Sequence, residues 1–532
     1  MSSSSVIFPY AVNPFDLCIN FPLIWYYLKL FYVVSLFFSN YFLINSIFKT
    51  LFVKKTITQK TKNVVDFSKP NLYIGTNQYN EKFYIPEKGL YQNILVTGTI
   101  GSGKTSSIMY PISKQLIEYK AYSEKEKLGL LILDVKGNFY SQIKKYIFSS
   151  SRVNDLILVN LDGGFKYNPL DKPHLSPQVL ANRLKNILLL FSKNNSDSYW
   201  LDKAEQVLAN CILFCRLYNN GYVDFIELHK LVNSKEYFFN KVDYTRKLFL
   251  AGALSKKDVF NLHSVLNFFE EEFFKLDERV LSIIKSEITR ITSTFISEYE
   301  VCTTFCPKRE EITFSGFSET LEKGKIVVLN LNIAEYKNLS KIIAAYLKLD
   351  FQTEVLSNLA KNTNTRTVAF ISDEYHEYVT STDADFFAQS REAKCINIVA
   401  TQSYTSLLKT INNESAVKVI IQNLINKIWF RTDDLFTIEE AQKQIGREDK
   451  KKINRSISEN AQETKFNYLT NSLQSKNSNI SESITTCIQT DFIFDTNFFT
   501  QNLEVFSCLA FISDGSRILK PQKLYLTPYF KL

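Results

Sequence analysis

Three glycines lie within six positions of a chain that has only 15 glycines in 532 residues. They belong to the segment Asn93–Ile112, NILVTGTIGSGKTSSIMYPI, in which an apolar run leads into a glycine-rich turn. The P-loop spacing G-x-x-x-x-G-K-[ST] is met by Gly98, Gly103, Lys104 and Thr105. Backbone N–H groups of such a loop curl around an anion, and the following helix adds the positive end of its dipole. The segment therefore predicts a phosphate-binding loop between a buried strand and a helix.

The residue types in this loop suit a nucleoside triphosphate with a divalent cation. Lys104 is expected to reach the β- and γ-phosphates as a point charge, and Thr105 to offer its hydroxyl to Mg²⁺. The residues expected to contact ATP are Gly98, Thr99, Gly101, Ser102, Gly103, Lys104, Thr105 and Ser106. An ordinary glycine turn is the alternative, but the strand and helix patterns on either side favour nucleotide binding.

A P-loop alone binds nucleotide, and hydrolysis needs a carboxylate at the end of another strand of the sheet. The segment RTVAFISDEYHEY provides two carboxylates after an apolar run, Asp373 and Glu374. We expect Asp373 to hold Mg²⁺ through water, and Glu374 to orient or deprotonate the attacking water. An exposed acidic turn is the alternative, which the P-loop upstream disfavours because one sheet must present both groups at its carboxyl edge.

Two further polar residues flank the next apolar run, INIVAT at 396–401. Gln402 follows this run, where a polar side chain can sense the γ-phosphate. Arg391 precedes it, where an arginine could reach the nucleotide of a neighbouring subunit. Taken alone, such residues are more often a helix cap and a surface salt bridge.

Short apolar runs typical of strands alternate with helical stripes along the chain. The strand runs stand at 128–134, 155–161, 325–332, 367–372, 396–401 and 427–432. Between about 176 and 300 the apolar residues follow helical spacing, as in Val280, Ile284, Ile288 and Ile291. We predict a doubly wound α/β nucleotide-binding fold interrupted by an inserted all-α domain. The expected boundaries are 1–55 for a membrane anchor, 56–175 and 321–532 for the two parts of the nucleotide-binding domain, 176–320 for the helical insertion, and 453–483 for a mobile polar loop.

The first 55 residues carry a candidate membrane span. Residues 30–48 are 19 positions without a charge, enough to cross a bilayer. Four lysines follow between 54 and 62, so the positive-inside rule puts the bulk of the chain in the cytoplasm. A buried amphipathic hairpin is the alternative, because Asn40 and Asn45 weaken the span. Residues 17–28 are a candidate second, partial element, and no positively charged region precedes them as a cleaved signal peptide would require.

Charge and cysteine usage add little about function. The net charge is +9, but residues 1–70 hold seven lysines against two aspartates, so the rest of the chain is nearly balanced. Bulk charge therefore does not indicate a nucleic-acid partner. The eight cysteines are scattered, and the pairs Cys211/Cys215 and Cys302/Cys306 lack the further ligands of a zinc site. We expect buried thiols in a reducing cytosol and no structural metal.

The ordered set of motifs resembles the type IV secretion coupling proteins of the TraG/TraD type, membrane-anchored motors that feed DNA into conjugation channels. The resemblance covers roughly residues 90–532. Its blocks are ILVTGTIGSGKTSS, LILDVKGNFY (131–140), KYNPLD (166–171), YWLDKAEQVL, FISDEYHEYV, SREAKCINIVATQSYTSL and IIQNLINKIWFRTDD (420–434). The second block resembles the D-P-K-G-E-L element of the family, with Val135 and Asn138 at the altered positions.

This resemblance implies a RecA-like P-loop NTPase core, a homo-hexameric ring and translocation of DNA, expected to be single-stranded, through a central pore. It implies ATP and Mg²⁺ as cofactors, a bacterial inner membrane location, and contacts with a type IV secretion channel and relaxosome-type proteins. Carried over by position, Lys104 and Thr105 bind phosphate and Mg²⁺, Asp373 and Glu374 are the acidic pair, Arg391 acts in trans and Gln402 is the sensor.

Three departures from the family pattern stand out. EYHEYV replaces a more apolar, glycine-containing stretch, the amino-terminal anchor is short, and the D-P-K-G-E-L element is altered.

Other classes of protein remain open. A chromosomal DNA pump of the FtsK/HerA kind shares the core, but the helical insertion disfavours it. An ABC-type ATPase is disfavoured because no L-S-G-G-Q-like segment lies between the two motifs. A non-pumping adaptor that recruits secretion substrates would not need Glu374 and Arg391.

Overall fold

The computed structural model describes residues 19–52, 68–134, 136–137, 139–191, 198–331, 336, 338–360, 366–460, 465–467, 472–474 and 479–531. The chain divides into two compact units, residues 1–65 and 66–532.

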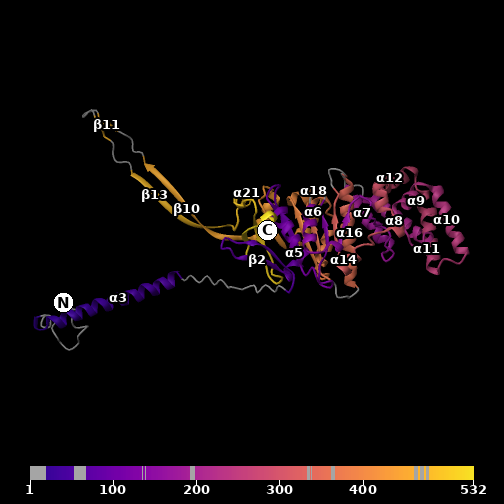
Figure 1. Ribbon diagram of the computed structural model, residues 1–532. Helices are drawn as coiled ribbons and strands as arrows, with labels where there is room; N and C mark the ends of the chain where they lie inside the picture. Colours follow the sequence, from indigo (N-terminus) through magenta and orange to yellow (C-terminus); the bar gives the residue numbers. More distant parts are fainter. Residues whose placement is uncertain are drawn as a thin grey trace. The chain divides into compact units, whose positions relative to one another are not determined.

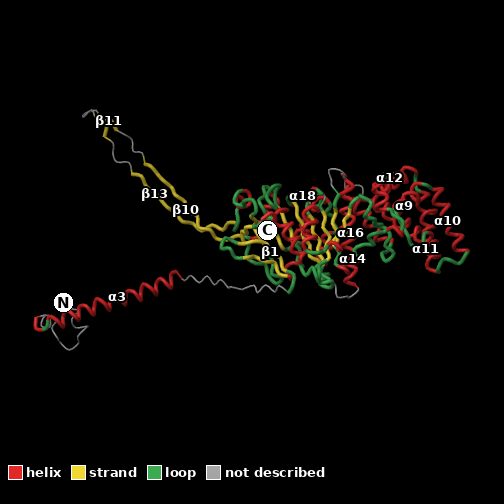
Figure 2. Tube along the Cα trace, viewed as in Figure 1, coloured by secondary structure: helices red, strands yellow, loops and turns green. Residues whose placement is uncertain are grey.

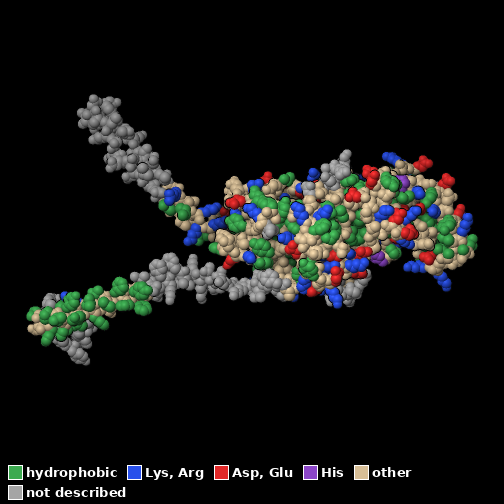
Figure 3. Space-filling model, in the orientation of Figure 1, with side chains coloured by type: hydrophobic (Ala, Val, Ile, Leu, Met, Phe, Trp, Pro, Cys, Tyr) green, Lys and Arg blue, Asp and Glu red, His purple; other side chains and the backbone are tan. Residues whose placement is uncertain are grey.

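The first unit contains one long helix, α3 (Pro22–Phe52). Its residues 22–42 are long and apolar enough to cross a membrane, and none of that stretch is buried within the protein. Figure 3 shows the surface of residues 22–42 as nearly continuous hydrophobic side chains. The predicted charge-free stretch 30–48 lies inside α3. The separate element expected at 17–28 lies partly outside the described residues: of those described, residues 19–20 are helical and residues 22–28 belong to α3.

The second unit is built on an eleven-stranded sheet with the order β2-β1-β15-β14-β9-β3-β8-β7-β4-β6-β5. Figure 1 labels its strand β2, and Figure 2 shows strands in yellow among helices in red. The strands from β9 to β5 are parallel: β9 (Asn426–Trp429), β3 (Ile94–Thr97), β8 (Cys395–Thr401), β7 (Val368–Ser372), β4 (Gly129–Leu133), β6 (Ile326–Leu329) and β5 (Leu156–Val159). The six strand runs predicted outside the P-loop segment are confirmed. All are short, and β4, β6 and β7 are nearly fully apolar and buried, as strands covered on both faces should be.

The remaining four strands extend the sheet in antiparallel pairing: β1 (Asn71–Thr76), β2 (Lys82–Pro86), β14 (Ser507–Phe511) and β15 (Gln522–Tyr525). The sequence analysis did not predict them. Three of the four contain residues that are only partly buried, so their apolar pattern is weaker than that of the central strands.

Helices cover both faces of the sheet. Along β3, Ile94 and Val96 point to one core, whereas Leu95 points to the other. The first core contains residues of α5 (Tyr110–Glu118) and α6 (Phe139–Ser149). The second contains residues of α14 (Ser318–Lys323), α16 (Asn338–Ala360), α17 (Asp383–Gln389), α18 (Tyr404–Ile411) and α19 (Glu414–Asn423). The arrangement is a mixed α/β fold in which loops at the carboxyl edge of the parallel strands are free to build a site.

The described residues between 177 and 305 are helical, as predicted. The helices are α7 (Pro177–Phe191), α8 (Ser198–Tyr218), α9 (Phe225–Asn233), α10 (Lys235–Leu250), α11 (Lys256–Asn267), α12 (Glu278–Ile296) and α13 (Tyr299–Phe305). In α12 the stripe Ile284, Ile288, Ile291 is buried, and these side chains belong to the same core as the second face of the sheet. Because that core is continuous, residues 66–532 form one compact unit, and the domain boundaries within it remain a prediction.

The mobile loop expected at 453–483 is a wrong prediction for the described residues. Strands β10 (Arg447–Asn460) and β13 (Asn479–Phe492) pair antiparallel over their whole length. Strands β11 (Lys465–Asn467) and β12 (Ser472–Gln474) form a shorter antiparallel pair. The polar composition concealed this ribbon, because a two-stranded ribbon outside the main sheet has both faces open to water and needs few apolar residues. Three short helices complete the fold: α4 (Glu87–Leu90), α20 (Leu435–Ile445) and α21 (Thr496–Thr500).

Candidate nucleotide-binding site

The predicted phosphate-binding loop follows β3 at the carboxyl edge of the sheet and leads through a π-helical turn, Thr105–Met109, into α5. Gly103 has a φ of +97°, and a Cβ there would lie 2.7 Å from Cδ1 of Phe506. A Cβ on Gly98 would lie 2.5 Å from Cβ of Phe430. These two positions need glycine because neighbouring side chains crowd the backbone and Gly103 is in the left-handed region. The loop is therefore a packed element of the fold.

Lys104 is buried under this loop. Its Nζ donates to the carbonyl oxygens of Gly98, at 2.5 Å, and Thr99, at 3.1 Å. Burial lowers the pKa of Lys104, while the negative charges of Asp373 and Glu374 act in the opposite direction. The ammonium group thus lies inside the loop whose backbone N–H groups would face a phosphate.

Asp373 meets the P-loop directly. It follows β7, and its Oδ2 accepts a hydrogen bond of 2.8 Å from the Thr105 hydroxyl. Burial, and next the charge of Asp134, raise the pKa of Asp373 to about 6, although the Thr105 bond lowers it. In the sheet, β8 lies between β7 and the P-loop strand β3. The hydrogen bond between Thr105 and Asp373 therefore joins residues that follow two non-adjacent strands.

Glu374 lies in the left-handed region, with φ +50° and ψ +43°. For a residue other than glycine this conformation is strained and often accompanies function. Its Oε1 accepts a hydrogen bond from Lys136, and its Oε2 accepts one from Nε2 of Gln402 at 3.0 Å. Burial alone would raise the pKa of Glu374, but the bonds from Lys136 and Gln402 outweigh it and lower the pKa. Glu374 is thus held as a carboxylate.

Gln402 lies where the sequence analysis expected it, directly after β8 and beside the acidic strand β7. The structure therefore brings Lys104, Thr105, Asp373, Glu374 and Gln402 to one edge of the sheet. Their catalytic and binding roles remain predictions.

Arg391 lies away from this edge of the sheet. It precedes β8, which runs parallel to β3, so Arg391 is at the amino edge of the sheet and the P-loop is at the carboxyl edge. A seven-residue strand spans about 23 Å. The Arg391 side chain is exposed, and its carbonyl closes a turn by accepting from the N–H of Lys394. Arg391 thus does not contact the P-loop of its own chain.

The residues around Thr105 fit a magnesium ion. A hydroxyl and a buried carboxylate face each other, and Asp134 adds a second negative charge close enough to raise the pKa of Asp373. A divalent cation would relieve this repulsion. Mg²⁺ usually takes one or two protein oxygens and completes its shell with phosphate and water. Among the described residues no group of three or more Asp, Glu, His or Cys is placed to hold a metal ion.

Three functional candidates had no role assigned from the sequence: Lys136, Asp134 and His376. Asp134 ends β4 and accepts from the backbone N–H groups of Lys136, at 2.9 Å, and Phe139, at 3.0 Å. It thereby fixes the turn that presents Lys136. His376 Nδ1 lies 3.6 Å from Oε2 of Glu374, and burial lowers the pKa of this histidine. Lys136 and Asp134 could have been found from the LILDVKGNFY block, because the charged residues of this block follow an apolar strand, as Asp373 and Glu374 do.

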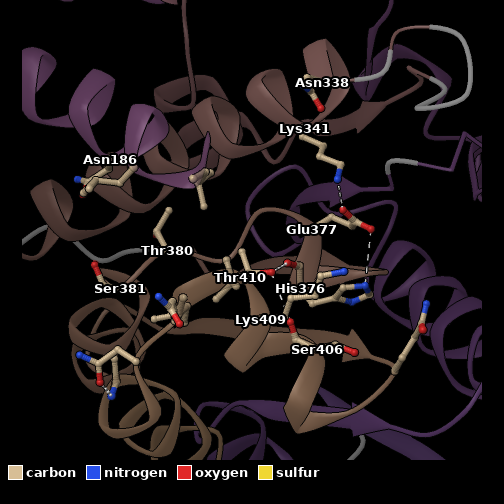
Figure 4. Close-up of a pocket in the computed structure, with 18 of the residues that line it drawn as sticks. Asn186, Asn338, Lys341, His376, Glu377, Thr380, Ser381, Ser406, Lys409 and Thr410 are labelled. Atoms are coloured by element: carbon tan, nitrogen blue, oxygen red, sulfur yellow. Dashed lines mark hydrogen bonds and ion pairs between the residues drawn. The ribbon is translucent and has the colours of Figure 1, made fainter. Parts of the chain in front are cut away.

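A polar cleft of about 1220 Å³ adjoins this edge (Figure 4). It is lined by residues of α7, α8, α16 and α18 as well as by Gln402 and His376. Figure 4 shows Lys341 of α16 directed at Glu377, with which it forms an ion pair. Glu377 Oε1 lies 3.7 Å from Nε2 of His376. Helix α16 and Glu374 are thus linked through Lys341, Glu377 and His376.

Comparison with known proteins identifies the relatives of this chain. Residues 250–490 match the family model of the type IV secretion-system coupling protein DNA-binding domain. Among solved structures, the bacterial conjugative coupling protein TrwBdeltaN70 in its unbound form aligns with a TM-score of 0.56 and 12% identity, over 86% of this chain and 89% of that chain. Residues 250–490 are thus similar to the DNA-binding domain of type IV coupling proteins, and the chain as a whole shares the fold of TrwB.

Two further TrwB structures share the fold of this chain. TrwB in complex with ADP and Mg²⁺ aligns with a TM-score of 0.56 at 12% identity, over 86% of this chain and 91% of that chain. TrwB with the non-hydrolysable ATP analogue ADPNP aligns with a TM-score of 0.53 at 12% identity, over 83% of this chain and 86% of that chain. The expected RecA-like NTPase fold with an all-α part is confirmed. None of the curated proteins matches the chain in sequence.

Proposed function

We propose that this chain is a membrane-anchored ATPase that delivers DNA, or a DNA–protein substrate, into a type IV secretion channel. The observation that carries the proposal is the meeting of five side chains at one sheet edge: Lys104, Thr105, Asp373, Glu374 and Gln402. A module that only binds its partners has no need of a carboxylate held ionised beside a P-loop.

In the proposed reaction the P-loop N–H groups and Lys104 bind the β- and γ-phosphates of ATP. Thr105 and Asp373 would hold Mg²⁺, which supplies charge neutralisation on the phosphate oxygens. Glu374 accepts a proton from the attacking water, and its lowered pKa keeps it deprotonated at neutral pH. Gln402, which follows β8 and donates a hydrogen bond to Glu374, senses the γ-phosphate.

The remaining parts of the proposal concern assembly and cargo. Arg391 lies on the opposite edge from the P-loop of its own chain, which suits a residue that completes the site of a neighbour in a homo-hexameric ring. The matched family domain supports DNA as the cargo, since it is described as a DNA-binding domain. Helix α3 would anchor the chain in the bacterial inner membrane, with the bulk of the chain in the cytoplasm, beside the channel and relaxosome-type proteins.

The test is the ATPase rate of the full-length chain with and without single-stranded DNA, with Lys104→Ala as the matched inactive control. Stimulation by DNA that Lys104→Ala abolishes is the expected result. A rate that DNA leaves unchanged would favour a substrate-recruiting adaptor. Stimulation by double-stranded DNA alone would favour a pump of the FtsK/HerA kind.

A further inference from the structure

We propose that Lys136 is a positioning residue that distinguishes ATP from ADP. When ATP binds, Lys136 leaves its ion pair with Glu374 and pairs with the γ-phosphate instead. This inference rests on the proposed function, because it assigns a regulator to the Glu374 of that site. It starts from one contact, the ion pair between Nζ of Lys136 and Oε1 of Glu374.

The side chains of the two partners of this ion pair differ in how freely they can move. The Glu374 side chain is 7% exposed, whereas the Lys136 side chain is 49% exposed. Glu374 is further fixed by its Gln402 bond and by the carbonyl of its own backbone, which accepts from the N–H of Glu377 at 2.9 Å. Lys136 is therefore the partner that can move, because a half-exposed lysine on a turn has a long, flexible stem.

The turn that carries Lys136 lies beside the phosphate-binding elements. Lys136 follows β4, and β4 pairs with β7, the strand that ends at the acidic pair. The positive charge of Lys136 is close enough to Lys104 and Asp373 to lower the pKa of each. The ammonium group thus lies within the electrostatic reach of the side chain that is expected to bind the γ-phosphate.

A bound triphosphate would offer Lys136 a second anionic partner with more charge than a carboxylate. An ammonium has three donors and forms point-charge contacts with phosphate oxygens. Once drawn to the γ-phosphate, Lys136 would leave Oε1 of Glu374 directed at the attacking water, while Gln402 still holds Oε2. ADP lacks the γ-phosphate and cannot draw Lys136 away. Lys136 would thus couple the presence of a cleavable phosphate to the release of the base.

The test compares the binding of ADP and of a non-hydrolysable ATP analogue to the full-length chain carrying Lys136→Met, Lys136→Arg or the control Lys144→Met. Lys144 is an exposed lysine on α6, the helix that follows the same turn. Lys136→Met should weaken binding of the ATP analogue about tenfold, the worth of one charged hydrogen bond, and leave ADP binding unchanged. Lys136→Arg should restore much of the preference for the triphosphate, and Lys144→Met should behave as the parent chain.

A second comparison isolates the exchange. In Glu374→Gln the lysine has lost its anionic partner, so affinity for the ATP analogue should rise several-fold, and this rise should vanish in Lys136→Met/Glu374→Gln. Equal weakening of ADP and analogue binding by Lys136→Met would overturn the inference, as would a rise that persists in the double variant. Binding is measured without turnover, so a chain that binds both nucleotides and hydrolyses neither would contradict the proposed function while the affinity ratio still decides the role of Lys136.

Discussion

The side-chain amide of Gln402 donates a hydrogen bond to Glu374, with Nε2 and Oε2 3.0 Å apart. The two residues end neighbouring parallel strands, β8 and β7, and lie 28 positions apart in the chain. Because both strands end at the same edge of the sheet, a substitution at one residue would change the hydrogen bonding of the other. The pair therefore links the proposed base to the proposed γ-phosphate sensor.

Replacing Glu374 with glutamine tests the role of the base. Glu374→Gln should lower kcat by about 10²–10⁴-fold, since it removes the carboxylate that accepts the proton. ATP should stay bound because the phosphate-binding loop is untouched, whereas Lys104→Ala should lose both binding and turnover. The measurement is steady-state ATPase activity together with equilibrium binding of labelled ATP. Hydrolysis by Glu374→Gln at the parental rate would show that the acidic pair is wrongly assigned.

A buried ion pair holds the segment that follows Glu374. Lys348 of α16 donates to Oδ2 of Asp383 at 2.6 Å, and both side chains are fully buried. Asp383 also accepts from Tyr375, the residue directly after Glu374. Lys348→Met would leave a buried carboxylate without its counter-ion, which costs about 3–5 kcal/mol. The melting temperature should fall by about 3–5 °C.

The matched control for that variant is Lys418→Met. Lys418 forms an exposed ion pair with Glu414 one turn away on α19, at 2.8 Å. Such surface pairs contribute little to stability, so the melting temperature should not change. Equal melting temperatures for Lys348→Met and Lys418→Met would mean that the buried pair does not hold this segment in place.

Cys302 should be the most reactive of the four cysteines between residues 177 and 306. A hydrogen bond from the Cys306 thiol lowers the pKa of Cys302 to about 7, and Cys302 is half-buried at α13. Burial instead raises the pKa of Cys211 and Cys215. The thiolate is the nucleophile, so alkylation of Cys302 by iodoacetamide should rise with pH and reach half its maximum rate near pH 7. Peptide mass spectrometry would measure it.

The control for this titration is Cys306→Ala, which removes the hydrogen-bond donor. The midpoint for alkylation of Cys302 should then move to higher pH, toward the ordinary value for a thiol. A midpoint that is the same in both chains would contradict the assigned cause.

The central sheet was predictable because its strands are buried on both faces. Runs such as Leu130–Leu133 and Val368–Ile371 are fully apolar, and each ends in a polar residue at the edge where the site forms. The P-loop was predictable for a different reason, since the backbone at Gly98 and Gly103 tolerates no side chain. Both signals are local in sequence, and both were found in the structure.

The contacts that complete the site were not predictable from spacing. Lys136 and Glu374 are 238 positions apart, and only the pairing of β4 with β7 brings them together. The ribbon of β10 and β13 was missed because it has no buried face. Ile453, Ile484 and Ile488 on it are each more than half exposed, so its apolar alternation is sparse.

Removing the first helix should change how the protein fractionates. The full-length chain should sediment with membranes and resist extraction by high salt, because α3 exposes an apolar surface long enough to span a bilayer. A chain that starts at Asn63 should be soluble, since the first strand of the sheet begins only at Asn71. Full-length protein that high salt releases would show that α3 does not cross the membrane.

Arg391 provides the test of a working ring. It lies at the amino edge of the sheet, away from the P-loop of its own chain, and its side chain is exposed. An arginine supplied to the site of a neighbouring subunit stabilises the charge on the γ-phosphoryl group in the transition state, and such residues contribute about 10³–10⁵ in rate. Lys104→Ala and Arg391→Ala should therefore each be nearly inactive as pure proteins.

Mixing these two variants should restore part of the activity. Some interfaces will then pair the intact P-loop of an Arg391→Ala subunit with the intact Arg391 of a Lys104→Ala subunit, which is a complete site. A mixture of two Lys104→Ala preparations is the control, because none of its interfaces is complete. Subunit exchange is followed separately by energy transfer between labelled chains. If the subunits exchange and the mixture stays as inactive as its components, Arg391 acts within its own chain or only supports the turn before β8.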